Sequence, residues 1–446
     1  MTKSLVPLLV LFFLASSCLI VAKPVSGTSS IIQNSWATKS PMPQAMSDVA
    51  AVAVNGKIFA IGSSGSNEEY DPSTDMWTIR EPIPTYRQDF AMASYLNKIY
   101  CIGGYANNGR VTGVNEVYDI VTDTWTTKSS MPTNRSWLDA NVVDGKIYLI
   151  GGQNDSSLTQ VNEIYNIAAD SWTISAPIPT ATSAYASAVV DNKIFFMSSS
   201  INQIYDIKTG AWNLGASPPL PVWAGKAVAT VGMNAPEKIY VLSAISSELV
   251  NSNTTVNQVY DPKTDTWVVG APLPTTRYSF GFTVSNDLVY AIGGFTTTYQ
   301  NFPDDLINGP SVTLYSTNEQ YTPFGYGTVS PTVSVSSPEN KNYSTGEISL
   351  NFTMNKAVNW VGYSLDGKDN VTITGNTTLS GLSNGSHNIT VYAKDSFENI
   401  GASETVVFII ASEPFPIVPV AAVSAVAVAV VAIGLIFYYR KQKVRA

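Results

Sequence analysis

Histidine and cysteine are nearly absent from this sequence. Its 446 residues include one histidine, His387, and two cysteines, Cys18 and Cys101. With a single imidazole, which we expect on the exposed side of a β-strand, a histidine-based zinc site and a His-dependent catalytic triad are excluded. Cys18 falls in a predicted leader, so Cys101 has no intrachain partner and stability must come from burial of apolar residues. We expect Cys101 to be a small buried hydrophobe.

Charge is also scarce, and what there is leans acidic. Charged residues make up 13% of the chain. Between the two apolar ends lie 20 Lys and Arg against all 33 Asp and Glu, a net charge of −13. Such a surface repels nucleic acid, so nucleic-acid partners are excluded. The apolar content is that of a folded protein, and the length predicts two or more domains.

The N-terminus is typical of a secretory signal. Lys3 precedes an uncharged apolar run over residues 5–22, which is followed by Lys23. The pattern predicts a signal peptide over residues 1–22, with cleavage after Ala22 or a few residues later. Lipoprotein processing at Cys18 is the weaker alternative, because the lipobox-like ASSC lacks the usual leucine and the apolar run continues past it.

The C-terminus carries a second apolar run. Residues 417–439 contain no charge, and about 20 such residues cross a bilayer core as a helix. Tyr438 and Tyr439 stand where interfacial aromatic residues belong, and residues 440–446 are rich in Lys and Arg. Because positive residues stay inside, we predict a single-pass cell-membrane protein with an extracellular N-terminal region and a cytoplasmic tail of residues 440–446.

A repeat occupies the first two-thirds of the chain. The stretch KIYCIGG from Lys98 recurs as KIYLIGG from Lys146, and looser copies begin at Lys57, Lys193, Lys238 and Leu288. The first five copies lead to a polar residue and a Tyr and then to a Trp, and Pro-x-Pro turns follow at residues 82–84, 177–179 and 272–274. The Trp residues are Trp77, Trp125, Trp172, Trp212 and Trp267. Each unit is a small antiparallel sheet with two apolar faces, which only radial stacking against its neighbours can bury.

These spaced glycine pairs, Tyr and Trp resemble the kelch family over residues 35–323. The resemblance implies an all-β fold with a six-bladed β-propeller, to which we assign residues 31–323. The sixth unit has Gly293-Gly294 and Tyr321 but no Trp after it, whereas Trp36 stands alone before the first unit. We therefore expect the N-terminal strand to complete the last blade and close the ring, as kelch propellers often do.

Residues 331–411 break the repeat. Alternating stretches at residues 332–335, 348–352, 360–365, 371–374, 387–393 and 405–410 predict a β-sandwich, with Trp360 as its core aromatic residue. The segment NGSHNITVYAKD from Asn384 resembles a strand of Ig-like modules in archaeal and bacterial surface proteins. The resemblance implies a spacer between propeller and membrane.

Asn-x-Ser/Thr sequons cluster in this second domain. In an exported chain they predict a glycoprotein, with sites at Asn342, Asn351, Asn370, Asn376, Asn384 and Asn388. Three more sequons lie in the propeller region, at Asn134, Asn154 and Asn253.

The kelch resemblance also raises one enzyme hypothesis, a copper oxidase similar to galactose oxidase. Such a site needs several imidazoles and a Cys–Tyr cross-link, which His387 and Cys101 do not provide. Asp119 recurs at the same repeat position as Asp71, Asp206 and Asp261, and Glu116 at the same position as Glu163 and Glu319, which indicates a scaffold role. We therefore expect no catalytic residue, no metal and no cofactor, although a carbohydrate-active enzyme of epimerase or oxidase type stays open as the alternative function.

In kelch propellers that bind ligands, residues after the glycine pair and after the Pro-rich turn line one face. Carried over to this sequence, these binding positions are Tyr86, Arg87, Tyr105, Arg135, Trp137, Gln153, Tyr185, Trp223, Arg277, Tyr278 and Phe295. Aromatic rings beside arginines suit a glycan or an acidic peptide. The alternative is that the arginines tie neighbouring loops together. The predicted function is recognition of an extracellular protein or glycan.

Overall fold

The computed structural model describes residues 31–245, 254–298, 311–411 and 433. The predicted signal peptide and cytoplasmic tail lie outside these residues, and so does the predicted span apart from Ile433. Within the described residues, no helix is long and apolar enough to cross a membrane. The elements of this part of the chain are β-strands, which confirms the all-β prediction for it.

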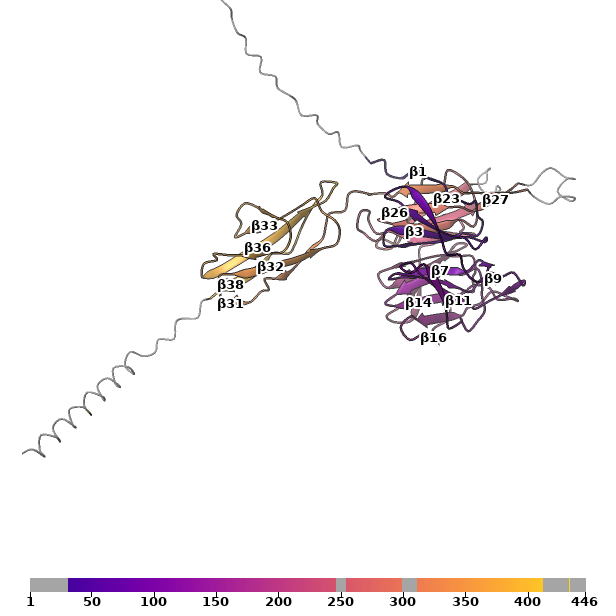
Figure 1. Ribbon diagram of the computed structural model, residues 1–446, viewed down its shortest axis with the longest axis horizontal. Coiled ribbons are helices and arrows are strands. Elements are labelled where there is room, and N and C mark those ends of the chain that lie inside the picture. The colour runs from indigo at the N-terminus through magenta and orange to yellow at the C-terminus, as the bar shows by residue number, and fades with distance from the viewer. Residues whose placement is uncertain (1–30, 246–253, 299–310, 412–432, 434–446) are drawn as a thin grey trace, which may run out of the picture. The chain divides into compact units, whose positions relative to one another are not determined.

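Six four-stranded antiparallel sheets, blades 1 to 6, occupy the repeat region (Figure 1). Blade 1 contains β2 (Ala50–Val54), β3 (Lys57–Ile61), β4 (Asn67–Asp71) and β5 (Met76–Arg80). Blade 2 contains β7 (Ala91–Tyr95), β8 (Lys98–Ile102), β11 (Asn115–Asp119) and β12 (Thr124–Lys128). Blade 3 contains β13 (Ala140–Val143), β14 (Lys146–Ile150), β15 (Asn162–Asn166) and β16 (Ser171–Ile174).

The second half repeats this order. Blade 4 contains β17 (Ala186–Val190), β18 (Lys193–Ser198), β19 (Ile201–Asp206) and β20 (Ala211–Gly215). Blade 5 contains β21 (Lys226–Ala229), β22 (Ile239–Ile245), β23 (Thr254–Asp261) and β24 (Thr266–Gly270). Blade 6 contains β25 (Gly281–Ser285), β26 (Leu288–Ile292), β29 (Asn318–Thr322) and β1 (Ser35–Lys39).

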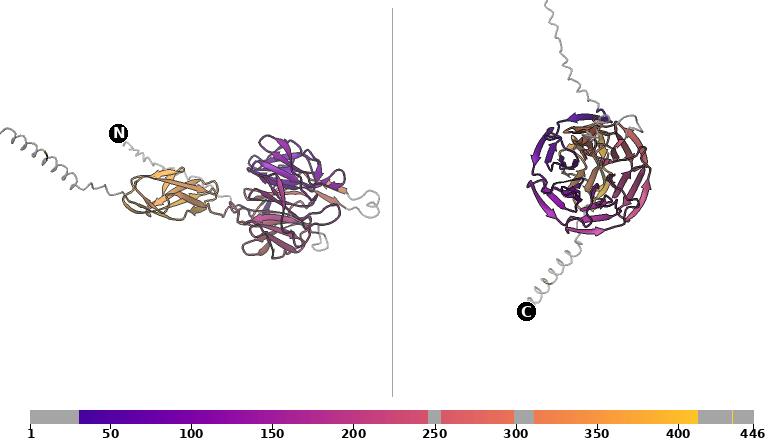
Figure 2. Two further views of the ribbon diagram at one scale, coloured as in Figure 1. Left: turned by 90° about the horizontal axis from the view of Figure 1, so that it is seen from below. Right: turned by 90° about the vertical axis from the view of Figure 1, so that its right-hand side faces the viewer.

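The first strands of the blades contact one another in a circle. β2 packs against β7, β7 against β13, and the contacts continue through β17, β21 and β25 back to β2. The right-hand view of Figure 2 shows the sheets arranged around a central axis. This arrangement is a β-propeller, closed by packing between sheets rather than by one continuous sheet.

The repeated Tyr and Trp join neighbouring blades. In each blade the two rings stack with centroids 4.9–5.1 Å apart, as in Tyr70–Trp77 and Tyr118–Trp125. Each indole also donates a hydrogen bond to a backbone carbonyl just beyond the outer strand of the preceding blade. The donors are Trp36, Trp77, Trp125, Trp172, Trp212 and Trp267. The recurrence of these rings in the sequence therefore reflects the contact between blades.

The outer strand of blade 6 comes from the other end of the propeller sequence. β1 pairs with β29, which places Trp36 opposite Tyr321. The Trp36 indole donates to the carbonyl of Ala271 at 2.9 Å, beyond the end of blade 5. Trp36 thus takes the place of the Trp that the sixth repeat lacks.

Short strands extend three connections beyond the blades. They are β6 (Arg87–Gln88), β9 (Tyr105–Ala106), β10 (Arg110–Val111), β27 (Phe295–Thr298) and β28 (Ser311–Leu314). β6, β9 and β10 form one small sheet, and β27 pairs with β28.

Residues 333–410 form two further sheets. The first has the order β30 (Val333–Ser337), β32 (Ile348–Met354), β35 (Thr377–Leu379). The second has the order β31 (Asn342–Tyr343), β38 (Val406–Ile410), β36 (Gly385–Lys394), β33 (Trp360–Leu365), β34 (Val371–Ile373), with β37 (Ile400–Ala402) beside β36. Alternate residues of both sheets share one apolar cluster, which includes Leu350, Ile389 and Phe408.

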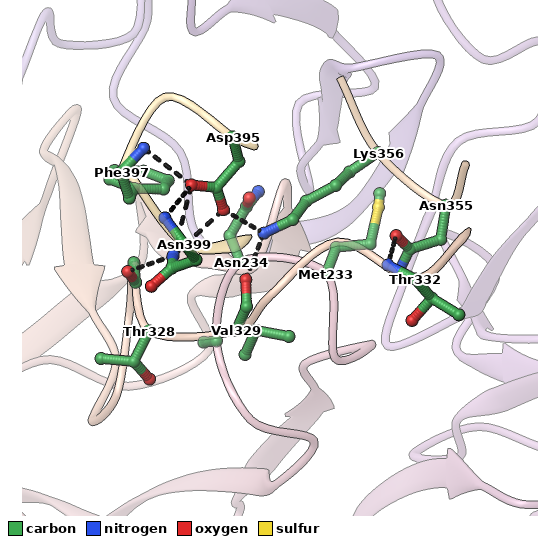
Figure 3. Close-up of polar contacts among 12 residues, drawn as sticks. Met233, Asn234, Thr328, Val329, Thr332, Asn355, Lys356, Asp395, Phe397 and Asn399 are labelled. Carbon is green, nitrogen blue, oxygen red and sulfur yellow. Dashed lines mark hydrogen bonds and ion pairs between the residues drawn. The ribbon is translucent and has the colours of Figure 1, made fainter. Parts of the chain in front are cut away.

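Two details of this region differ from the sequence prediction or go beyond it. Trp360 is only half-buried and donates to Thr372 Oγ1 at 3.0 Å, so the prediction of a core Trp360 is wrong and the buried Phe408 ring occupies the core. Figure 3 shows a buried polar cluster in which Lys356 Nζ lies 2.6 Å from Asp395 and also donates to the carbonyl of Val329. Through Lys356, this cluster holds Val329, which lies four residues before β30, to the loop that follows β36.

Candidate functional site

Six short connections, each leading into the first strand of a blade, meet at one end of the propeller axis. In each connection one residue adopts the left-handed backbone conformation, with φ between 45° and 55°; these residues are Asp48, Asp89, Trp137, Ala184, Ala224 and Ser279. All six line one cavity of about 500 Å³, which we name the central mouth. A cavity that touches every blade lies on the axis, so the fold gathers loops from the whole propeller there.

Trp137 is unusual among these six, because a bulky residue rarely adopts a left-handed conformation. Its backbone N–H donates to the Asp89 carbonyl at 3.0 Å, and its own carbonyl accepts from Ala184 N–H at 3.0 Å. These bonds join three successive connections and leave Trp137 45% exposed. Backbone conformations of this kind cluster at functional sites, where the surrounding structure maintains them.

Trp137 is a wall common to three cavities. Besides the central mouth, it lines a cavity of about 590 Å³ together with Tyr105 and Gln153, which we name the Tyr105 cavity. It also lines a cavity of about 380 Å³ together with Trp223 and Ile201, which we name the Trp223 cavity. This end of the propeller therefore offers three adjoining hollows around one indole.

Six of the predicted aromatic binding residues present part of their surface to solvent. Four are 40–62% exposed, namely Tyr86, Tyr105, Trp137 and Trp223. Tyr278 and Phe295 are half-buried, with ring centroids 6.2 Å apart. Gln153 is also half-buried and lines the Tyr105 cavity. Ligand binding by these residues stays a prediction.

The other four predicted binding residues are buried, which corrects the assignment of the three arginines. Arg87, Arg135 and Arg277 are at most 1% exposed, and Tyr185 is 2% exposed. The Tyr185 hydroxyl donates to the carbonyl of Ile150. Arginine side chains so enclosed hold the loops in place instead of meeting a ligand, which was the alternative for them. Tyr185 lines the central mouth with little exposed surface, and ligand binding by it stays a prediction.

Each of these arginines pairs with a glutamate of its own blade. Arg87 contacts Glu116 and also donates from Nε to the Gly103 carbonyl at 2.8 Å and from Nη2 to the Cys101 carbonyl at 2.7 Å. The three ion pairs are Arg87–Glu116, Arg135–Glu163 and Arg277–Glu319. A buried ion pair with further hydrogen bonds to backbone carbonyls specifies the geometry of the connection it crosses.

One signal in the sequence could have identified this role. The arginines occur only in the blades that carry a glycine pair, at residues 103–104, 151–152 and 293–294. The glycines are needed because a Cβ at Gly103 would lie 2.6 Å from the Arg135 carbonyl oxygen of the next connection. Arginine, glutamate and the glycine pair thus form one structural unit.

Sequence reasoning missed the charged residues of the central mouth. Lys226 lies 3.3 Å from Asp139, while Asp48 and Asp89 face the same cavity. Burial and the charge of Asp48 raise the pKa of Asp89 to about 6, against a hydrogen bond with Trp137 and the charge of Lys226. The central mouth is therefore negatively charged at neutral pH, and its negative charge decreases as the pH falls through the pKa of Asp89.

The residues considered for chemistry are enclosed. His387 is 7% exposed, so the expectation of an exposed strand residue is wrong; its Nδ1 lies 2.8 Å from Asp366 and its Nε2 2.8 Å from the Ser383 carbonyl. Cys101 is buried, and burial raises the pKa of its thiol to about 12. Among the described residues, no cluster of three or more His, Cys, Asp or Glu is placed to hold a metal ion.

The six predicted glycosylation sites all have exposed side chains. The Asn376 amide oxygen already accepts from the Phe352 backbone at 3.0 Å. In the propeller, Asn134 is exposed and Asn154 half-buried, while Asn253 lies outside the described residues. Glycosylation itself stays a prediction.

Comparison with known proteins supports a kelch-type propeller. Residues 81–227 match the family described as FKB95, Kelch-repeats domain. A solved structure described as that of YjhT aligns over 61% of this chain and 99% of its own length, with a TM-score of 0.50 and 16% identity. At that identity the likeness concerns the fold alone. The Ig-like character of residues 331–411 stays a prediction.

A curated relative covers a shorter part of the chain. Halomucin of Haloquadratum walsbyi is 45% identical over 95 residues, which is 20% of this chain. The matched stretch is 1% of the length of halomucin. The likeness therefore concerns one segment and not the whole of either protein.

Proposed function

We propose that this protein recognises an extracellular protein or glycan through the end of the propeller that carries the central mouth. One observation carries the proposal: three adjoining cavities share the partly exposed Trp137 side chain. Concave sites lined by aromatic side chains and a few polar groups are the usual form of ligand sites. Aromatic residues with low conformational entropy are also the commonest anchors of recognition surfaces.

The remainder of the chain supports display at a cell surface. The leader and the apolar run over residues 417–439 predict export followed by anchoring. Residues 331–411 then serve as an Ig-like stalk, and the exposed sequons on them suit a glycosylated spacer. If the anchor acts as proposed, the full chain sediments with membranes, and deletion of residues 417–439 releases it into the medium.

A binding array tests recognition directly. The full chain, purified in detergent, is applied to arrays of glycans and of extracellular proteins. Saturable binding that leaves the ligand unaltered supports the proposal. Turnover of the ligand contradicts it in favour of the alternative, a carbohydrate-active enzyme on a propeller scaffold. Binding that is unchanged when both Trp137 and Trp223 are replaced by Ala contradicts the assignment to this end of the propeller.

A further inference from the structure

The Tyr105 cavity has two kinds of lining. Aromatic surface comes from Tyr105 and Trp137, which are 40% and 45% exposed. Carboxamides come from Gln88, Gln153 and Asn154. Asn154 Oδ1 already accepts from the backbone N–H groups of Ser156 and Ser157, at 2.9 and 2.8 Å. Asn154 therefore offers its amide N–H donors, while the two glutamines offer both donors and acceptors, and such groups match a ligand that carries several hydroxyl groups. An aromatic face matches the apolar C–H face of a sugar ring.

The walls of the cavity are held before any ligand arrives. The Tyr105 hydroxyl donates to the Gly109 carbonyl at 2.9 Å, which closes the β9–β10 hairpin on itself. Val111 N–H donates to Asp155 Oδ1 at 3.0 Å, which ties this hairpin of blade 2 to a loop of blade 3. Preorganised walls lower the entropy lost on binding.

The opposite wall is equally constrained. Ser136 and Gln153 exchange two backbone hydrogen bonds, of 2.9 and 3.0 Å. The backbone of the adjacent Trp137 is hydrogen-bonded to the Asp89 carbonyl and to the Ala184 N–H. These bonds hold Trp137 in a left-handed backbone conformation, which bulky residues rarely adopt. No other blade has an aromatic residue at this left-handed position. The repeat structure therefore does not require an indole here.

The charges around the cavity restrict the ligand. Asp89 and Asp155 contribute two carboxylates and Arg110 one guanidinium. Asp155 already uses one oxygen on the Val111 amide. The lining thus has one more carboxylate than guanidinium, and this excess negative charge disfavours an anionic sugar. One excess negative charge is too little to select a strongly cationic sugar.

We infer that the Tyr105 cavity is a subsite for a neutral pyranose residue of a glycan, whose ring packs against Tyr105 and Trp137 while Gln88, Gln153 and Asn154 bind its hydroxyl groups. The inference rests on the proposed recognition function and names its ligand class and position. The subsite lies between blades 2 and 3, beside the central mouth rather than in it.

Calorimetry with defined oligosaccharides tests this inference. The full chain is produced in a host without N-glycosylation, because Asn154 belongs to a sequon. The probes are neutral oligosaccharides ending in mannose, glucose or galactose, with an oligogalacturonate and a chitosan oligosaccharide as charged comparisons. We expect saturable binding of at least one neutral probe, and binding of both charged probes at least tenfold weaker.

Substitutions then locate the subsite. Trp137→Ala and Tyr105→Ala are each expected to weaken binding of the neutral probe at least tenfold. Ile174→Ala and Leu214→Ala are the controls, because both are exposed apolar side chains on outer strands that line none of the three cavities. They are expected to change the Kd less than twofold. Thermal unfolding of all four variants verifies that each is folded.

The outcomes separate this inference from the proposed function. Glycan binding that is lost with Trp223→Ala but survives Trp137→Ala and Tyr105→Ala overturns the subsite and leaves recognition standing. Equal or tighter binding of a charged probe overturns the neutral ligand class. Binding of proteins alone overturns the inference, while turnover of the probe overturns both proposals.

Discussion

Asn34 accepts a hydrogen bond from Tyr321, with 2.8 Å between Oδ1 and Oη, although 287 positions separate them in the sequence. Asn34 also accepts from the backbone N–H of Ala271 at 2.6 Å. In four other blades an aspartate two residues before the Trp makes the equivalent bond to the blade's own Tyr; these pairs are Tyr70–Asp75, Tyr118–Asp123, Tyr165–Asp170 and Tyr260–Asp265. The N-terminal segment therefore supplies blade 6 with its outer strand and also with the side chain that accepts the hydrogen bond of the blade's Tyr.

Loss of the Asn34 side chain should destabilise the propeller. Asn34→Ala removes two part-buried hydrogen bonds, and we expect a loss of about 1–3 kcal/mol in the free energy of unfolding. Deletion of residues 34–43 also removes Trp36 and should lower the melting temperature further. Differential scanning calorimetry measures both, with the exposed β1 substitution Thr38→Ala as control. A truncated chain that melts with the parent contradicts closure by β1.

The buried ion pairs should be far more sensitive than surface pairs. Arg135→Met leaves the Glu163 carboxylate buried without its cation, and we expect a loss of about 3–5 kcal/mol. Lys98→Met breaks the ion pair with Asp119, which is partly exposed. Because solvent screens such pairs, we expect the free energy of unfolding to fall by less than about 1 kcal/mol. Denaturant titration compares the two variants. Equal losses would show that Arg135 does not have the structural role assigned to it.

Glu68 occupies the glutamate position of blade 1, but no arginine accompanies it there. Its side chain is fully buried, and its Oε2 has no hydrogen-bond partner within the described structure. Burial raises the pKa of Glu68, against a hydrogen bond from Ser66. The folded protein thus retains a proton that the unfolded chain releases above about pH 4.3, so this group costs stability as the pH rises through its folded pKa.

Removing the charge of Glu68 should therefore stabilise the protein at neutral pH. We expect Glu68→Gln to raise the melting temperature at pH 7 and to have little effect at pH 4. Glu116→Gln is the matched comparison and should lower it at pH 7, because Arg87 loses its anion. A Glu68→Gln variant that melts below the parent at pH 7 would contradict the cost assigned to this carboxylate.

His387 should make the 333–410 region more stable in mild acid. The Ser383 carbonyl and the Asp366 carboxylate raise the pKa of His387 against desolvation. A raised histidine pKa gives stability that is fully present below the unfolded value of about 6.5 and is lost as the pH rises through the folded value. Melting curves of the parent and His387→Gln should differ most at pH 5.5 and converge toward pH 8.5. A difference that does not change with pH would refute this linkage.

The sequence by itself determined the repeat, the all-β class and the role of Trp36. Spaced Tyr, Trp and glycine pairs carry this information because each blade must make the same contact with its neighbour. The β-strands of residues 331–411 could also be predicted from the sequence, because alternate residues of these strands are apolar. Trp360 was misplaced because periodicity marks a face but does not distinguish its centre from its edge.

The tertiary structure alone decided which predicted residues meet solvent. Arg87 and Tyr86 are adjacent in the sequence, yet one is buried against Glu116 and the other is exposed. Asp48, Trp137 and Ser279 are of three different residue types, so no motif could bring them together. They meet because radial packing directs the same short connection of every blade to one axis, which is a property of the closed ring and of no single repeat.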